Sequence, residues 1–229
     1  MAAKTGGTKG RRAGQAGAPV RSDEPLSLDR IVAAAVDLLD AQGVGGLTMR
    51  KLAEHLGAGA MSLYWHVGNK EEVFDLALDA VLAYRPPETS MDWRGSIVHL
   101  LEDWRASMLA HCWSAALLPR RKLGPNMLGR LERLAETLAD AGVADADLNT
   151  AIWSLWNYVM GATVTRGNFD RSDADRAAAQ QQLAALYPTI GRSSLLLDDD
   201  WDGAFRKGLE LLLDGVAPDP RPRPSTSSG

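Results

Sequence analysis

Apolar residues recur at helical spacing through most of this chain. Over residues 28–39 they fall three or four positions apart, which places them on one face of an α-helix. The same spacing marks further segments at 48–56, 60–67, 70–84, 93–113, 127–141, 148–167 and 201–216. A less apolar segment, 173–187, is rich in Ala and Gln and is expected to form a surface helix. Because no segment alternates convincingly with period two, the sequence predicts an all-α protein.

Capping residues and breakers divide the first part of this pattern into short helices. Ser27, Thr48 and Asn69 each stand just before an apolar periodic segment, where a short polar side chain can cap a helix. Gly43 stands where a left-handed residue would end the first helix. Proline disfavours a helical conformation in the residue before it, so the fourth helix is expected to end before Pro86.

Composition divides the chain into four parts. Residues 1–26 are small, polar and basic, and are expected to be disordered. This arm fits a nucleic-acid contact, but it fits a simple solubilising tail as well. Residues 27–85 form a first helical domain and residues 86–217 a larger second one, followed by a Pro- and Ser-rich disordered tail at 218–229.

Charge and cysteine content exclude several classes of protein. The chain has 25 Lys+Arg and 29 Asp+Glu, and its net charge of −4 argues against a protein that coats nucleic acid without sequence preference. The single Cys112 excludes a disulfide scaffold. No run approaches the ~20 apolar residues of a membrane span, and the N-terminus lacks the apolar core of a signal peptide, so we expect a cytoplasmic protein with no membrane contact. We also find no Gly-rich phosphate loop, metal-ligand cluster or paired nucleophile and base, and therefore expect no metal, no cofactor and no enzymatic activity.

Residues 48–67 have the outline of a helix-turn-helix. A helix of about two turns is followed by a Gly-containing break and a second short helix, and such a second helix can enter a DNA major groove about 12 Å wide. The residues expected to lock the two helices together are Leu52, Ala53, Leu56, Leu63 and Val67. The residues left for the outer side are Arg50, Ala60, Met61, Ser62, Tyr64, Trp65, His66 and Lys70. Tyr64 and Trp65 could instead be core aromatics, but neighbouring helical positions point about 100° apart, so at least one is expected to be exposed.

The individual residues carry a more specific signal than this outline. The chain contains Thr48-Met49-Arg50-Lys51-Leu52-Ala53, then Leu63-Tyr64-Trp65-His66-Val67, then Asn69-Lys70. On these motifs, residues 28–84 resemble the DNA-binding domain of the tetracycline-repressor (TetR-type) family of bacterial transcription regulators. Trp93 and the segment 203–215 resemble the C-terminal domain of the same proteins.

The resemblance implies a role for each outer residue. Arg50, Ala60, Met61 and Ser62 would face base edges. Tyr64, His66 and Lys70 would hold phosphates, Thr48 would help at the start of the second helix, and Trp65 belongs to the same DNA-binding surface. The tetracycline repressors carry Gln and then Pro where this chain has Ala60 and Met61. A methyl group and a thioether cannot make the bidentate contact of an amide to adenine, so we expect a different operator.

The family also implies a homodimer that binds a palindromic DNA site, because two reading helices meet successive major grooves. Two apolar stripes are expected to form the dimer interface. The first consists of Leu148, Ile152, Leu155, Val159 and Thr163, and the second of Phe205, Leu209 and Leu212. As an alternative, both stripes face the core of their own subunit.

Large apolar and aromatic residues gather in the second domain. We predict that some of them line a cavity for a small effector, namely Leu100, Trp104, Met108, Leu118, Met127, Trp153, Trp156 and Met160. The same residues could instead form a packed core with no cavity. By resemblance, Leu118 and Leu100 stand near the magnesium-binding His and the ligand-binding Asn of the tetracycline repressors. Both positions are apolar here, so we expect an apolar or aromatic effector and no magnesium–tetracycline complex.

Together these features predict a ligand-responsive transcriptional repressor whose partners are double-stranded DNA, a small molecule and a second copy of the chain. Helix 70–84 would transmit the effector signal, because it connects the two domains. One alternative is a constitutive DNA-binding regulator whose second domain only dimerises. A remote alternative is a small helical enzyme that uses the Trp-rich region.

Overall fold

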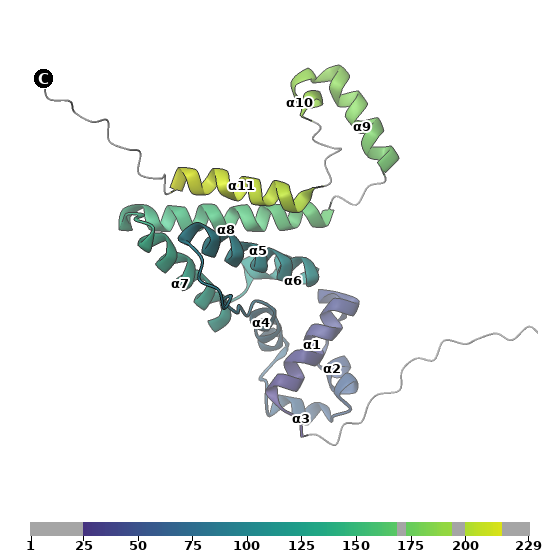
Figure 1. Cartoon of the computed structure of the whole chain (residues 1–229). Helices are drawn as coiled ribbons and strands as arrows, with labels where there is room; N and C mark the ends of the chain where they lie inside the picture. The colour runs from purple at the N-terminus through teal and green to yellow at the C-terminus, as the bar shows by residue number, and fades with distance from the viewer. Residues whose placement is uncertain (1–24, 169–172, 194–199, 217–229) are drawn as a thin grey trace, which may run out of the picture.

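The computed structural model describes residues 25–168, 173–193 and 200–216, and every regular element within these ranges is helical (Figure 1). This confirms the all-α fold class. The predicted disordered arm and tail lie almost entirely outside the described residues. None of the described helices is long and apolar enough to cross a membrane.

The helices form two groups, which we call the head (residues 25–82) and the body (residues 93–216). The helices of the head are α1 (Leu28–Gln42), η1 (Val44–Gly46), α2 (Met49–Leu56), α3 (Ala60–Tyr64) and α4 (Lys70–Val81). The helices of the body are α5 (Trp93–Ala110), α6 (Cys112–Leu117), η2 (Leu118–Arg120), α7 (Pro125–Asp140), α8 (Asp145–Asn168), α9 (Asp173–Leu186), α10 (Pro188–Arg192) and α11 (Trp201–Val216).

The head and the body form two parts of the molecule in Figure 1, and α4 is the helix of the head that packs against α6 and α7 of the body. In the body, α8 and α11 lie side by side as an outer layer, and α5, α6 and α7 pack on the inner side of α8 (Figure 1). The α9–α10 hairpin stands apart from this bundle (Figure 1). One continuous apolar core runs from α1 through α4 and α5 to α11.

The predicted capping residues start the helices of the head. Ser27 Oγ accepts a hydrogen bond from the Arg30 amide at 3.3 Å, and Thr48 Oγ1 accepts one from the Lys51 amide at 3.2 Å. Asn69 Oδ1 accepts from the amide of the third residue after it at 2.9 Å. Since the first amides of a helix have no partner within it, these side chains set where each helix begins.

The predicted helix 93–113 is wrong at its C-terminal end, because the chain breaks at His111 (φ −118°, ψ 69°). The break brings two side chains to Asp40 of α1. His111 Nδ1 lies 2.9 Å from an oxygen of that carboxylate, and Trp113 Nε1 donates to it at 2.7 Å. A contact from a segment over 70 residues away decides this boundary, which is why local periodicity missed it.

Several other helix boundaries also differ from the predicted ones. The structure ends α3 at Tyr64 and α4 at Val81, and it begins α8 already at Asp145. The short helix α10 (Pro188–Arg192) was not predicted at all. It begins at a proline, which suits the first turn of a helix because its missing amide has no intrahelical partner there.

Helix α7 begins without a capping side chain of its own, and α4 supplies one. The residue before α7 is Gly124, which has no side chain to offer. The buried carboxylate of Asp79 on α4 accepts hydrogen bonds from the amides of Asn126 and Met127, both at 3.1 Å. The negative charge of Asp79 therefore lies at the positive N-terminal end of α7.

Helix α7 in turn binds the C-terminal end of α4. The buried guanidinium of Arg130 donates to the carbonyls of Leu82 at 2.5 Å and Ala83 at 3.1 Å. It also donates to the Leu100 carbonyl at 3.3 Å and to Asp103 Oδ2 at 2.6 Å. Burial lowers the pKa of Arg130, while the hydrogen bond and charge of Asp103 act in the opposite direction. A side chain of α4 thus binds the free amides at the start of α7, and a side chain of α7 binds the free carbonyls at the end of α4.

The close approach of α4 to α7 gives a stability prediction at two glycines. In Gly124→Ala, the added methyl group would overlap the Asp79 carboxyl and displace it from the start of α7. We expect urea unfolding, followed by circular dichroism, to show a loss of about 1–3 kcal/mol. The matched variant Gly129→Ala lies within α7 with open space around it, and helix propensity should make it about 1 kcal/mol more stable. Equal effects of the two substitutions would contradict the capping role of Asp79.

Candidate DNA-binding surface and effector region

The turn between α2 and α3 is closed by backbone hydrogen bonds around a left-handed glycine. Gly57 has φ 63° and ψ 24°, a conformation that costs glycine little. The Gly57 amide donates to the Glu54 carbonyl at 3.2 Å, and the Ala58 amide donates to the Ala53 carbonyl at 2.9 Å. These bonds end α2 abruptly and let α3 start three residues later in a new direction.

The inner side of α3 anchors it in the head. Leu63 of α3 and Val67 just after it are buried, as are Leu52 and Ala53 of α2, while Leu56 is half-buried. This arrangement agrees with the sequence pattern. Because the inner positions are filled, the remaining positions of α3 face outward.

The outer side of the head exposes most of the residues predicted to bind DNA. The exposed ones are Thr48, Arg50, Ala60, Met61, Ser62, Tyr64, Trp65 and His66. Met61 is 74% exposed and Trp65 is 87% exposed, and Tyr64 is also exposed. Neither aromatic side chain therefore belongs to the core. Large apolar side chains gathered on one exposed turn mark a surface that contacts another molecule.

Thr48 and Lys70 already have intramolecular contacts. The Thr48 hydroxyl caps α2, although Thr48 as a whole is exposed. Lys70 is half-buried, and its ammonium lies 5.0 Å from the centre of the Phe74 ring. To reach a phosphate, Lys70 would have to leave this ring.

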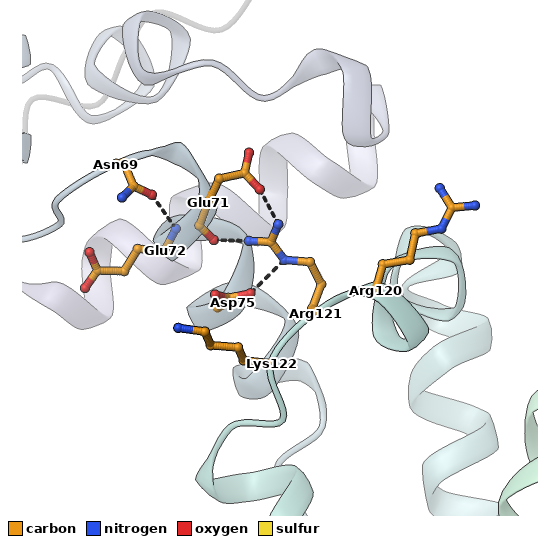
Figure 2. Close-up of a pocket in the computed structure, with 7 residues that line it drawn as sticks. All are labelled: Asn69, Glu71, Glu72, Asp75, Arg120, Arg121 and Lys122. Atoms are coloured by element: carbon orange, nitrogen blue, oxygen red, sulfur yellow. Dashed lines mark hydrogen bonds and ion pairs between the residues drawn. The ribbon is translucent and has the colours of Figure 1, made fainter.

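A loop of the body contacts the first turns of α4 through Arg121 (Figure 2). Arg121 Nε donates to Asp75 Oδ1 at 2.7 Å, and the same guanidinium bonds the carboxylate and the carbonyl of Glu71. Partial burial alone would lower the pKa of Arg121, but the hydrogen bonds and charges of Glu71 and Asp75 raise it overall. Around this contact is an open hollow of about 570 Å³ lined by Asn69, Glu71, Glu72, Asp75, Arg120, Arg121 and Lys122.

Most of the predicted effector residues belong to the apolar core of the body. Leu100, Trp104, Met108, Leu118, Met127 and Trp156 are buried in one core, and Met160 packs against it. The Trp104 and Trp156 rings contact edge to face with centroids 5.0 Å apart. Trp153 differs from these residues because it is 52% exposed, and its ring contacts that of Trp156 with centroids 5.5 Å apart.

A hollow of about 360 Å³ lies next to these core residues, between α5, α6 and α8. It is lined by Met108, Leu109, Cys112, Ala115, Ala116, Thr163 and Val164. Of the predicted effector residues, Met108 takes part in this lining. Sequence reasoning missed the alanines because small residues carry no aromatic or charged signal, and because the break at His111 turns α6 toward α8.

The predicted dimer stripes point mostly into the subunit. Leu155, Val159, Thr163, Phe205 and Leu209 are buried in the core, while Leu148, Ile152 and Leu212 are half-buried against it. The five buried residues expose almost no surface in the single subunit, and the dimer interface remains a prediction. On the same two helices, Trp153, Val164 and Leu211 are exposed.

Comparison with known proteins agrees with this geometry. Residues 31–77 match the model of the bacterial regulatory proteins of the tetR family, and residues 86–219 match the model of the tetracyclin repressor-like C-terminal domain. The chain therefore belongs to the TetR family of DNA-binding transcriptional regulators.

Individual relatives cover most of the chain. An HTH-type transcriptional regulator of Saccharopolyspora erythraea is 40% identical over 86% of this chain and 87% of its own length. The HTH-type transcriptional repressor DrrR1 of Streptomyces coeruleorubidus is 33% identical over 86% of this chain and 80% of its own length. Among solved structures, the TetR family protein ActR of Streptomyces coelicolor in complex with (S)-DNPA has a TM-score of 0.69 at 31% identity, covering 85% of this chain and 98% of that one.

The exposure of α3 predicts that its outer residues contribute little to stability. Met61→Ala and Trp65→Ala should each change the free energy of unfolding by less than about 0.5 kcal/mol, because both side chains are exposed. Leu63→Ala removes a buried side chain from the same helix and should cost about 2–5 kcal/mol. Urea titrations of the three variants measure this difference. A large loss in Trp65→Ala would show that this ring packs within the head.

Proposed function

We propose that this regulator is a homodimeric repressor that binds a palindromic operator and leaves it when a small, largely apolar or aromatic effector binds the body. One observation carries the proposal. Met61 on the outer side of α3 and Trp65 directly after this helix are exposed to solvent, while the inner side of α3 is anchored in the head. In a family of DNA-binding regulators, a short helix that is anchored on its inner side and exposed on its outer side is the element that enters the major groove.

The chemistry of this surface suggests how DNA is read. Ala60 and Met61 carry methyl and thioether groups, which suit contact with the 5-methyl group of thymine. Arg50 and Ser62 provide hydrogen-bonding groups for neighbouring base edges. Phosphates would be held by Tyr64, His66 and Lys70, with help from Thr48, and Trp65 belongs to the same DNA-binding surface.

Exposed apolar side chains support assembly into a homodimer. Trp153 and Leu211 are exposed on α8 and α11, which form the outer layer of the body, and the α9–α10 hairpin adds Leu186, Tyr187 and Ile190. A second subunit that covers these side chains would remove them from water. Two heads held by such a dimer would meet half-sites about 34 Å apart, which requires a palindrome.

The connection between head and body supports a response to ligand. The body offers such an effector open hollows along α5, one of them beside Met108 and Cys112, where α5 and α6 meet α8. Helix α4 is joined to the body through Arg121, Asp79 and Arg130. An effector that binds one arrangement of the body better than another would therefore shift the position of the head.

We place the division between the DNA-binding and effector domains after residue 85, in the segment that joins α4 to α5. We also propose that the regulator acts in the cytoplasm.

The second candidate function is a constitutive regulator whose body only dimerises. It gains support from the core, where large side chains fill the space between α5 and α8. Operator binding that no compound weakens would favour it.

Selection of genomic fragments on the purified protein tests the DNA-binding proposal. We expect one palindromic element whose binding weakens as the salt concentration rises, because phosphate contacts release counterions. Met61→Ala should relax the base preference at the same position of each half-site, at a cost of about 1 kcal/mol per contact. The control Leu128→Ala, an exposed apolar residue of the body, should bind like the wild type. Retention of arbitrary DNA that depends on residues 1–22 would contradict the assignment of α3.

A substitution at Leu211 tests the proposed dimer interface. This residue is 66% exposed on α11, so Leu211→Glu should leave the fold intact but place a charge in the proposed interface. We expect light scattering after size exclusion to show conversion of a dimer into monomers. Leu128→Glu, which changes an equally apolar exposed residue on α7, should remain dimeric. If both variants stay dimeric, the outer layer of α8 and α11 is not the interface.

A further inference from the structure

A second hollow, of about 440 Å³, lies between α5 and α11. Leu109 lines this hollow and also the one between α5, α6 and α8, so the two adjoin across a single side chain. The residue that distinguishes the second hollow is Arg105 of α5. Arg105 is only 6% exposed, although it carries a full positive charge.

The guanidinium of Arg105 is incompletely satisfied. Its Nη1 donates to Asp202 Oδ1 at 2.5 Å, and the cation lies 4.8 Å from the centre of the Phe205 ring. Its buried Nε has no hydrogen-bond acceptor among the described residues. The side chain of Asp202 is 87% exposed, and an ion pair with so exposed a partner contributes little. A buried cation in this state is costly, because buried donors are normally paired.

The remaining walls of the hollow are of two kinds. Ala106, Leu109 and Phe205 offer an apolar surface for a hydrocarbon or aromatic group. Arg206 is paired with Glu102 at 2.7 Å and adds no unpaired charge. Arg105 therefore lacks one hydrogen-bond acceptor, and an apolar wall lies beside it.

We propose that this hollow binds the carboxylate of an effector whose apolar or aromatic body lies against Leu109 and Phe205. A carboxylate has two acceptor oxygens in the geometry of a guanidinium edge. The Nε of Arg105 is buried, so the effector reaches it when the Arg105 side chain turns toward the hollow. The carboxylate of Asp202, which bonds Nη1 of the same guanidinium, then opposes the effector's carboxylate by charge repulsion. The inference rests on the proposed function, because it assigns a chemical class to the effector of a ligand-responsive regulator.

Isothermal titration with a matched pair of probes tests the site. 1-Naphthoate and 1-naphthamide have the same ring system, but only the first is an anion. Wild-type protein should bind 1-naphthoate at least about tenfold more tightly, the size expected for a hydrogen bond to a charged group. Arg105→Gln should abolish this preference. Lys207→Gln removes one positive charge from the exposed side of α11 and should keep it.

A second variant gives a change of opposite sign. Asp202→Asn removes the opposing carboxylate from an exposed position, so it should increase the preference for 1-naphthoate. This result stays informative even if Arg105→Gln fails to fold, which circular dichroism would show. Three results would each overturn the proposal. They are equal binding of the two probes by wild-type protein, an unchanged preference for 1-naphthoate in Arg105→Gln, and no increase of this preference in Asp202→Asn.

Operator release, measured by fluorescence anisotropy of labelled operator DNA, separates this inference from the proposed function. If 1-naphthoate binds through Arg105 but leaves the operator bound, and no other compound releases it, the site stands and the ligand-responsive function fails. If other compounds release the operator while the two naphthalene probes bind alike, the function stands and the carboxylate site fails.

Discussion

The exchange of caps between α4 and α7 is the constraint on which the two-part architecture depends. Asp79 of α4 closes the start of α7, and Arg130 of α7 closes the end of α4. Both side chains are buried, so neither can lose its partner without leaving polar groups unsatisfied. Because α4 also packs on α1 within the head, a change in the position of α7 would shift the helix-turn-helix with it.

The sequence predicted those features of the head that depend on a few neighbouring residues. Caps at Ser27, Thr48 and Asn69 and the glycine turn before α3 involve residues no more than five positions apart. For the same reason, the exposed side of α3 could be assigned residue by residue. The contact of His111 with Asp40 spans 71 positions, and neither side chain by itself indicates the other.

In the body, periodicity identified apolar faces but not what covers them. Leu155 and Val159 of α8 face the core, while Trp153 and Val164 on the same helix are exposed. A helix that is apolar on more than one side gives no clear stripe, so periodicity alone does not distinguish a face toward the core from a face toward a second subunit. The Trp-rich region posed the same problem, because aromatic side chains fill a core as well as they line a cavity. Arg105 was not predicted as a site residue, because its burial depends on packing between α5 and α11.

The placement of Cys112 has a practical consequence. It is the one cysteine of the whole chain, it is exposed, and it lines the hollow between α5, α6 and α8. Reactivity of a thiol depends on access to its sulfur, so a maleimide dye can be attached at this position without prior mutagenesis and without a second labelled product. The unaltered sequence thus contains its own attachment point for a spectroscopic reporter, located within the region where a ligand signal would begin.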